Sequence, residues 1–339
     1  MKPHLALSII SLFVFSVNIG LAQTLKNKEV QFLIDTTITI MKANAVNAEK
    51  VNWVSIKQDA YKQAENLDSP YEFGGVMRGI FKSIGDFHGQ FFQGDSSFRW
   101  QGKPLVISDE VKNEWKKSSG IKTGVLENNI GYLRVPGMSQ GNGRPDWDRK
   151  AQALNDSLSV LLSQHVKGLI LDLRIDGGGV MFPMMLGLKN LLGEGNIGSF
   201  QTKKSQMWSI KSNKFLIDTS VLAAINPKPS VDARSLPCVL LIGPGTGSSG
   251  EFLVMAFKGR SNTTLMGTET AGYVTINNGF FIKDKSSMNL SVGYGRDRKG
   301  RNYTQAIQPD IVLNSADNFN NLLDDAKVKA AIKWLKSQK

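Results

Sequence analysis

The sequence predicts an α/β fold in which a mainly parallel sheet is preceded by a small helical domain. Two stretches, residues 168–192 and 238–257, each run from a continuous apolar strand through a glycine turn into an apolar helix. Strands that are apolar without a break are typical of parallel sheets covered on both faces. Upstream of them, residues 30–84 carry apolar side chains at helical spacing. With 339 residues, 41% of them hydrophobic, the chain is long enough for one large core and a smaller domain.

The N-terminal residues have the pattern of a secretory signal peptide. Lys2 is followed by an apolar run, residues 5–22, which ends in the small residues Gly20 and Ala22. The run is dotted with Ser and Asn and has no strongly basic flank after it, which disfavours a retained membrane anchor. We therefore expect cleavage after Ala22 and export of a mature chain without a membrane span to the periplasm or the extracellular space.

Helical spacing defines the expected N-terminal domain. Apolar residues recur with a helical period in three segments, at residues 30–41, 54–67 and 71–84. The next residues are polar and weakly patterned, so only a short strand or two is expected there. We divide the chain into a signal peptide (1–22), a helical N-terminal domain (23–92), a connecting segment (93–129), a core (130–315) and a C-terminal helix (316–339).

Within the expected core, strands alternate with helices. Strands are expected at residues 130–135, 168–173, 239–242, 263–267, 280–282, 287–292 and 311–313, and helices at residues 147–163 and 182–192 and from residue 252 onward. Residues 205–235 are polar and proline-dotted and have no assigned element. A lid or an excursion over the cleft is one interpretation of that segment.

Charge, cysteine and motif content argue against several classes of protein. The net charge is +12, but the basic residues are scattered, which predicts a solvated basic surface and no nucleic-acid site. The one cysteine, Cys238, cannot form an internal disulfide. The segment GPGTGSSG loosely matches a dinucleotide fingerprint, with Glu269 as the ribose ligand, but it lies far toward the C-terminus and contains Pro244. No phosphate-loop lysine follows, and no set of metal ligands stands out, so neither a cofactor nor a metal is predicted.

Two short stretches carry side chains suited to acyl transfer. Ser248 and Ser249 lie where the second glycine turn enters its helix, so an exposed hydroxyl would stand beside unpaired amides. An ordinary glycine-rich turn with serine helix caps is the alternative. His88 lies in GDFHG, at the end of the third helical segment, and His165 lies in a corner before a buried strand. A lone histidine is more often structural than catalytic.

Five ordered blocks, GYLRVPGM, GLILDLRIDGGG, GTGSSGEFLVMAF, LMGTETAG and IQPDIVL, resemble the serine peptidase family of carboxyl-terminal processing (tail-specific) proteases and the tricorn protease core. The resemblance covers residues 130–313, and the helical N-terminal domain is similar to that of secreted bacterial members. It implies a crotonase-like core of repeated ββα units. A PDZ domain is not recognisable between the helical part and the core, which argues against processive reading of protein tails.

The resemblance also implies roles for individual residues. Ser248 stands three residues before Glu251, which is the place of the family's nucleophile. Ser249 would then give its N–H to the oxyanion hole. The glycine turn after the DLR strand supplies the other amide, so Gly178, together with Gly179, is the matching position.

The expected base departs from the tail-specific pattern. Those enzymes use a lysine in a segment that matches GTETAG, where this chain has Tyr273. Tyr273, Glu269 and Glu251 are candidates for residues that support the site. Tricorn-like members use a histidine from an earlier domain, and the resemblance makes His88 the preferred base. The place of the glutamate that orients it is taken by residues 302–304, which are Asn, Tyr and Thr.

The sequence therefore predicts an exported serine endopeptidase that acts on a peptide or protein, with His88 deprotonating Ser248 and with activity rising through a pKa near 6 to 7. One alternative is an inert member of the same fold that binds a peptide or an apolar ligand in the cleft. Another is a crotonase-like enzyme that polarises an acyl thioester with two amides. Export disfavours the last, because acyl-CoA would not be present outside the cytoplasm.

Overall fold

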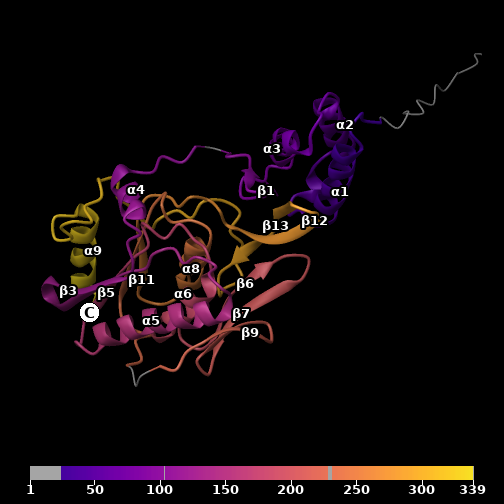
Figure 1. Ribbon diagram of the computed structural model, residues 1–339. Coiled ribbons are helices and arrows are strands. Elements are labelled where there is room, and N and C mark those ends of the chain that lie inside the picture. Colours follow the sequence, from indigo (N-terminus) through magenta and orange to yellow (C-terminus); the bar gives the residue numbers. More distant parts are fainter. Residues whose placement is uncertain (1–23, 103, 228–230, 339) are drawn as a thin grey trace, which may run out of the picture.

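The computed structural model describes residues 24–102, 104–227 and 231–338, so the expected signal peptide and its cleavage site lie outside the described residues. Figure 1 shows the N-terminal helices at one end of the molecule (indigo), the C-terminal helix α9 (Ala326–Ser337) at the other (yellow), and β-sheet between them. No helix among the described residues is long and apolar enough to cross a membrane.

Three helices occupy the N-terminal region where the apolar period predicted them. They are α1 (Lys28–Asn44), α2 (Trp53–Ala64) and α3 (Phe73–Ser83), with the 3-10 turns η1 (Ala48–Lys50) and η2 (Pro70–Glu72) between them. Asn27 and Asn52 accept backbone N–H groups at the starts of α1 and α2. The buried faces of these helices pack on Ile282, Met288 and Leu290 of a later hairpin. The helices are therefore anchored to a strand pair that lies about 200 residues further along the chain.

The first sheet is mainly parallel and has the strand order β14-β11-β10-β5-β4-β3. Its strands are β3 (Lys122–Leu126), β4 (Ile130–Arg134), β5 (Gly168–Asp172), β10 (Cys238–Ile242), β11 (Thr263–Gly267) and β14 (Ile311–Val312). Only β3 runs antiparallel to its neighbour. Strands β5 and β10 are adjacent, with Asp172 opposite Leu241, so the turns that follow them emerge side by side at one edge of the sheet.

Helices cover both faces of this sheet. They are α5 (Arg144–Leu162), α6 (Met181–Gly187), α7 (Lys189–Leu192) and α8 (Ser249–Phe257) on one face and α9 (Ala326–Ser337) on the other. Alternate strand residues face opposite ways: Leu169 and Leu171 pack with α5, α6 and α8, whereas Ile170 packs against α9. This two-sided burial explains the unbroken apolar runs of β5 and β10.

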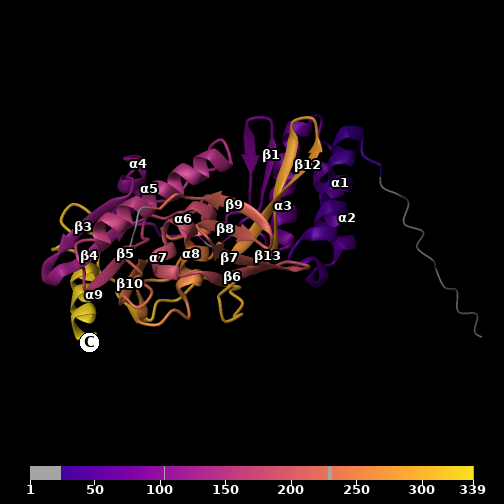
Figure 2. The same cartoon turned by 90° about the horizontal axis from the view of Figure 1, so that it is seen from below.

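The second sheet is antiparallel and has the order β2-β1-β13-β6-β7-β8-β9, with β12 also paired to β13. Its strands are β1 (Gln90–Gln93), β2 (Ser96–Phe98), β6 (Gly195–Gln201), β7 (Ser205–Lys211), β8 (Lys214–Ile217), β9 (Ser220–Ala224), β12 (Thr275–Lys283) and β13 (Ser286–Arg296). The hairpin β12–β13 projects toward the N-terminal helices, as Figure 2 shows. Strand β1 pairs with β13, which brings the segment after α3 next to the core.

Two segments differ from expectation. The stretch 205–235, for which a lid was one interpretation, begins with the strands β7, β8 and β9, because its scattered apolar residues alternate in and out of the sheet. The connecting segment 93–129 contains the helix α4 (Asp109–Lys116), capped by Ser108. This helix buries only Val111 and Glu114, so its apolar period is too short to be recognised in sequence.

Candidate active site

Ser248 lies between β10 and α8 in a backbone conformation that non-glycine residues rarely adopt. Its φ is 52° and its ψ is −114°. Backbone strain of this kind persists only where the surroundings enforce it. Here the N–H of Ser248 donates to Glu251 Oε2 at 3.0 Å and the N–H of Gly247 donates to the carbonyl of Asp176 at 2.9 Å. The backbone at Gly247 and Ser248 is therefore held by two hydrogen bonds to different parts of the chain.

Glu251 is a buried support for this turn. Besides the Ser248 amide, it accepts hydrogen bonds from the Thr270 hydroxyl and from the N–H of Gly272 at 2.8 Å. Burial raises the pKa of Glu251 to about 7, although these hydrogen bonds oppose the shift. Glu251 thus ties the start of α8 to the segment after β11.

The glycine turn after β5 lies directly against Ser248. A Cβ at Gly178 would come within 2.7 Å of the Ser248 Cβ and 3.2 Å of the Ser249 nitrogen. Gly178 and Gly179 both have a φ of 109°, which favours glycine. The Ser249 hydroxyl donates to the carbonyl of Gly179 at 2.6 Å, so the two turns are also joined by a hydrogen bond.

The amides at this junction correct one expectation from the sequence. The N–H of Gly178, expected to face a bound carbonyl, instead donates to Asp176 Oδ1 at 3.2 Å. Within the described residues, the N–H groups of Gly179 and Ser249 have no hydrogen-bond acceptor. Both residues line one cavity together with Ser248. The free pair of amides is therefore Gly179 and Ser249.

Asp176 lies beneath both turns. Its side chain is fully buried, its Oδ1 accepts the Gly178 N–H, and its Oδ2 has no partner in the described part of the chain. Burial raises the pKa of Asp176 well above its usual value, and the Gly178 N–H opposes this shift. Its backbone carbonyl holds Gly247 at the same time, so one residue supports the turn after β5 and the turn after β10.

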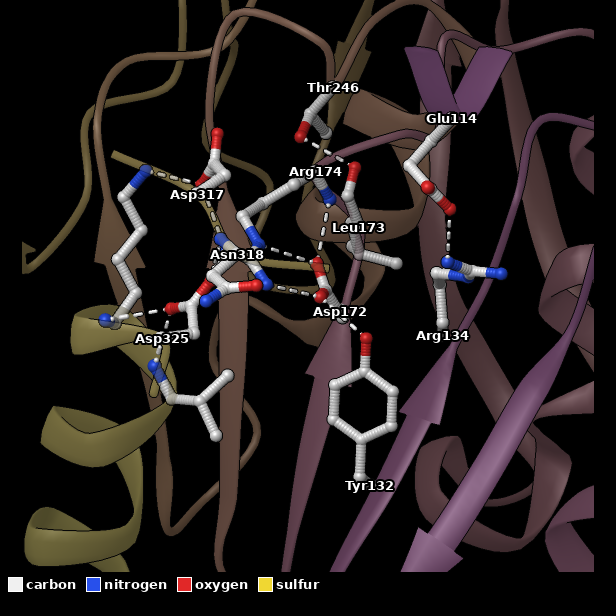
Figure 3. Close-up of polar contacts among 12 residues, drawn as sticks. Glu114, Tyr132, Arg134, Asp172, Leu173, Arg174, Thr246, Asp317, Asn318 and Asp325 are labelled. Atoms are coloured by element: carbon white, nitrogen blue, oxygen red, sulfur yellow. Dashed lines mark hydrogen bonds and ion pairs between the residues drawn. The ribbon is translucent and has the colours of Figure 1, made fainter. Parts of the chain in front are cut away.

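A buried ion-pair network anchors the end of β5 to the C-terminal segment. Arg174, which is 1% exposed, donates from Nη2 to Asp172 and from Nη1 to Asp317 and Asp325, each at 2.7 Å. Figure 3 shows the guanidinium between these three carboxylates. The network fixes the residue from which the Gly178 turn departs.

His88 lies on a turn between α3 and β1. Asp86 Oδ1 accepts the N–H groups of His88 and Gly89, at 3.1 and 2.7 Å, which sets the shape of this turn. The ring Nδ1 lies 2.9 Å from Thr275 Oγ1, and the ring contacts that of Tyr273, with 5.0 Å between centroids. Burial lowers the pKa of His88 to about 4, against the opposing effects of Asp86 and the Thr275 backbone. The imidazole is therefore neutral at pH 7. If His88 is the base, the rise of activity with pH that the sequence predicts near pH 6 to 7 is expected at lower pH.

One cavity of about 650 Å³ brings His88 and Ser248 together. No hydrogen bond joins the two side chains in the described structure. Aromatic and amide side chains form part of the walls and come from Trp147, Phe182, Phe200, Phe252, Gln140, Gln206, Asn277, Asn278 and Asn289. Aliphatic side chains complete the apolar part and come from Val180, Met181, Ile217, Leu222 and Ile276. Among the described residues that line the cavity, His88 alone has an ionisable side chain.

The remaining predicted residues separate into two groups. Tyr273, which occupies the place of the family lysine, packs beside the ring of His88. Glu269 is exposed and accepts a hydrogen bond from Gln308 at 2.9 Å, so it does not support the site. The sequence did not single out Thr275 or Asp176, because nothing local marks a polar residue that acts across the fold. No cluster of three or more metal-binding side chains occurs among the described residues.

Comparison with known proteins identifies what the chain is similar to. The model of Peptidase family S41 matches residues 129–313. The nisin-resistance protein of Lactococcus lactis subsp. lactis is 26% identical over 98% of this chain and 94% of its own length. The carboxy-terminal processing protease CtpA of Bacillus subtilis is 27% identical over 62% of this chain, which is 41% of that protein.

Solved structures share the fold. A lipoprotein from Streptococcus agalactiae superposes with a TM-score of 0.68 at 22% identity, covering 95% of this chain and all of the other. A peptidase from Parabacteroides merdae, described as putative in its name, superposes with a TM-score of 0.66 at 19% identity, covering 91% and 98% of the two chains. At these identities the likeness concerns the fold alone.

Proposed function

Since the chain belongs to peptidase family S41, we propose that it is an exported serine-type endopeptidase in which Ser248 is the nucleophile and His88 the general base. The observation that carries this proposal is the shared cavity, which both side chains line although they lie 160 positions apart in sequence. The parallel strands β4, β5, β10 and β11 with helices α5, α6 and α8 support the crotonase-like ββα core that the resemblance implies. Export rests on the signal-peptide pattern alone.

The proposed reaction begins when His88 Nε2 takes the proton from Ser248 Oγ as this oxygen attacks the peptide carbonyl. The N–H groups of Gly179 and Ser249 then donate to the oxyanion, a contribution of several kcal/mol in a site of this kind. His88 returns the proton to the leaving amine, and water hydrolyses the acyl-enzyme by the same route. A neutral imidazole at pH 7 is the form that this sequence of proton transfers needs.

Hydrolysis of defined peptides tests the proposal. The name of the nisin-resistance relative makes nisin the first peptide to try, followed by a library of peptides with uncharged residues around the scissile bond. Ser248→Ala and His88→Ala should each lower kcat by about 10³-fold or more without loss of fold. His165→Ala is the matched control and should retain activity, because this residue lies in an exposed corner after α5. Intact peptides with the unaltered protein would contradict the proposal.

A second candidate function is ligand binding without hydrolysis. The separate hydrogen bonding of His88 and Ser248, and Tyr273 in the place of the lysine, favour it. In that case the unaltered protein and Ser248→Ala should bind the same peptide with equal affinity, and mass spectrometry should find no product with either.

A further inference from the structure

A chain of hydroxyl groups leads away from the ring of His88. Thr275 Oγ1 on β12 lies 2.9 Å from His88 Nδ1 and 2.9 Å from Ser291 Oγ on β13. Ser291 Oγ lies 2.8 Å from Asp86 Oδ1 and 3.0 Å from Asn277 Oδ1. Ser291 and Asp86 are 2% and 5% exposed, so water has little access to the far end of this chain.

The directions of these hydrogen bonds follow from the number of available protons. Asp86 already accepts the N–H groups of His88 and Gly89 at Oδ1 and that of Ser291 at Oδ2. The oxygen of an amide side chain only accepts, so the single Ser291 hydroxyl proton is donated to Asp86 or to Asn277. The orientation of the Asn277 amide is set by its Nδ2, which donates to the His88 carbonyl at 3.1 Å. Ser291 must therefore accept from Thr275. The Thr275 hydroxyl, having donated its proton, can only accept from His88 Nδ1–H.

We propose that Asp86, Ser291 and Thr275 act as positioning residues that hold His88 in the tautomer with the proton on Nδ1. The Nε2 lone pair is then free for the cavity, where a general base needs it. This inference rests on the proposed role of His88 and identifies which groups orient it. They substitute for a carboxylate in direct contact with the ring, and no such carboxylate occurs among the described residues.

Few charged groups act on this ring. Asp86, from the same turn, favours the protonated form, and Arg99, after β2, disfavours it. From the segment before β12, Tyr273 contributes a ring contact. Replacing Thr275 or Ser291 therefore removes a hydrogen bond and leaves these charges in place.

Kinetics of matched variants provide the first test. Thr275→Val is nearly isosteric and removes the acceptor for Nδ1–H, so kcat should fall about 10- to 100-fold while KM stays close to its original value. Thr275→Ser restores the hydroxyl and should recover most of the rate. Ser291→Ala should give a smaller fall, and Ser287→Ala on the same strand should have no effect, since its hydroxyl makes no hydrogen bond in the described structure. Equal rates for Thr275→Val and the unaltered protein would overturn the proposal.

Nitrogen-15 NMR of the histidine side chains in the full-length Ser248→Ala protein gives a readout that needs no activity. The His88 signals, assigned by their loss in His88→Gln, should show protonated Nδ1 and bare Nε2 at pH 7. Adding Thr275→Val should raise the Nε2–H population, and adding Thr275→Ser should not. An unprotonated Nδ1 in the Ser248→Ala protein would overturn the proposed hydrogen-bond chain, whatever hydrolysis rates the variants have. Failure of the proposed function has a different signature, namely the expected tautomer in a protein that hydrolyses no peptide.

Discussion

The two sides of the cavity are built in different ways. The Ser248 side belongs to the parallel sheet, and backbone groups from adjacent turns together with the buried Glu251 hold it. The His88 side belongs to the helical region and the β12–β13 hairpin, and side-chain hydroxyls from two distant strands hold it. Ser248 is thus fixed by the local path of the chain, whereas His88 is fixed by how two parts of the fold meet.

The largest effect is expected from a substitution that removes the anchor of β5 on the Ser248 side. Arg174→Ala would leave Asp172 and Asp325 buried without their cation and Asp317 with Lys327 alone, which should cost about 3 to 5 kcal/mol in the free energy of unfolding. Chemical denaturation measures this cost. Arg234→Ala is the matched control, since its pair with Asp232 is exposed, and it should change stability little. A small effect of Arg174→Ala would mean that the network does not anchor β5.

A second substitution affects the same side at the site itself. Gly178→Val would press its side chain against Ser248 Cβ and the Gly247 carbonyl, so turnover should fall about 10²-fold or more. Gly177→Ala is the control, because its Cβ would meet nothing closer than 3.6 Å. Steady-state hydrolysis by the two variants decides the matter, and similar rates would show that the turns are not closely coupled.

The pH dependence of stability should have opposite slopes on the two sides. The pKa of His88 is about 4 in the folded protein, below the value of a free imidazole, so its contribution to stability should be lost as pH falls from about 6.5 to 4. The pKa of Glu251 is about 7, above that of a free carboxyl group, so its contribution should be lost as pH rises from about 4.5 to 7. Denaturation at several pH values checks both slopes. His88→Gln should remove the first slope alone and Glu251→Gln the second alone, and an unchanged profile would contradict the assignment.

The smallest effect is expected beneath the two turns. Burial raises the pKa of Asp176, which favours the uncharged acid, and Asp176→Asn is an uncharged side chain that keeps the Oδ1 that accepts the Gly178 N–H. Turnover should stay within about threefold of the unaltered enzyme, whereas Asp176→Ala should lower it further by freeing the Gly178 amide. A large loss in Asp176→Asn would indicate that the charged form of Asp176 is the functional one.

Much of the Ser248 side could be predicted from the sequence. Strands β5 and β10 carry unbroken apolar runs, and a glycine turn follows each, so their side-by-side exit at one sheet edge follows from parallel pairing. The identity of the free amide could not be predicted. Gly178 and Gly179 are equivalent in sequence, and only the position of the Asp176 carboxyl group decides which N–H is already bonded.

The sequence by itself determined the apolar periods, the glycine turns and the presence of His88 in a GDFH turn, because these depend on residues close together in the chain. Only the tertiary structure decided that His88 faces the cavity of Ser248 and that Thr275 and Ser291 connect its ring to Asp86. Those contacts join residues up to 205 positions apart, and a single hydroxyl on a strand has no local pattern that marks its partner. The physical reason is that a side-chain hydrogen bond depends on the positions of two atoms, which are set only when the hairpin, the helices and the sheet have packed together.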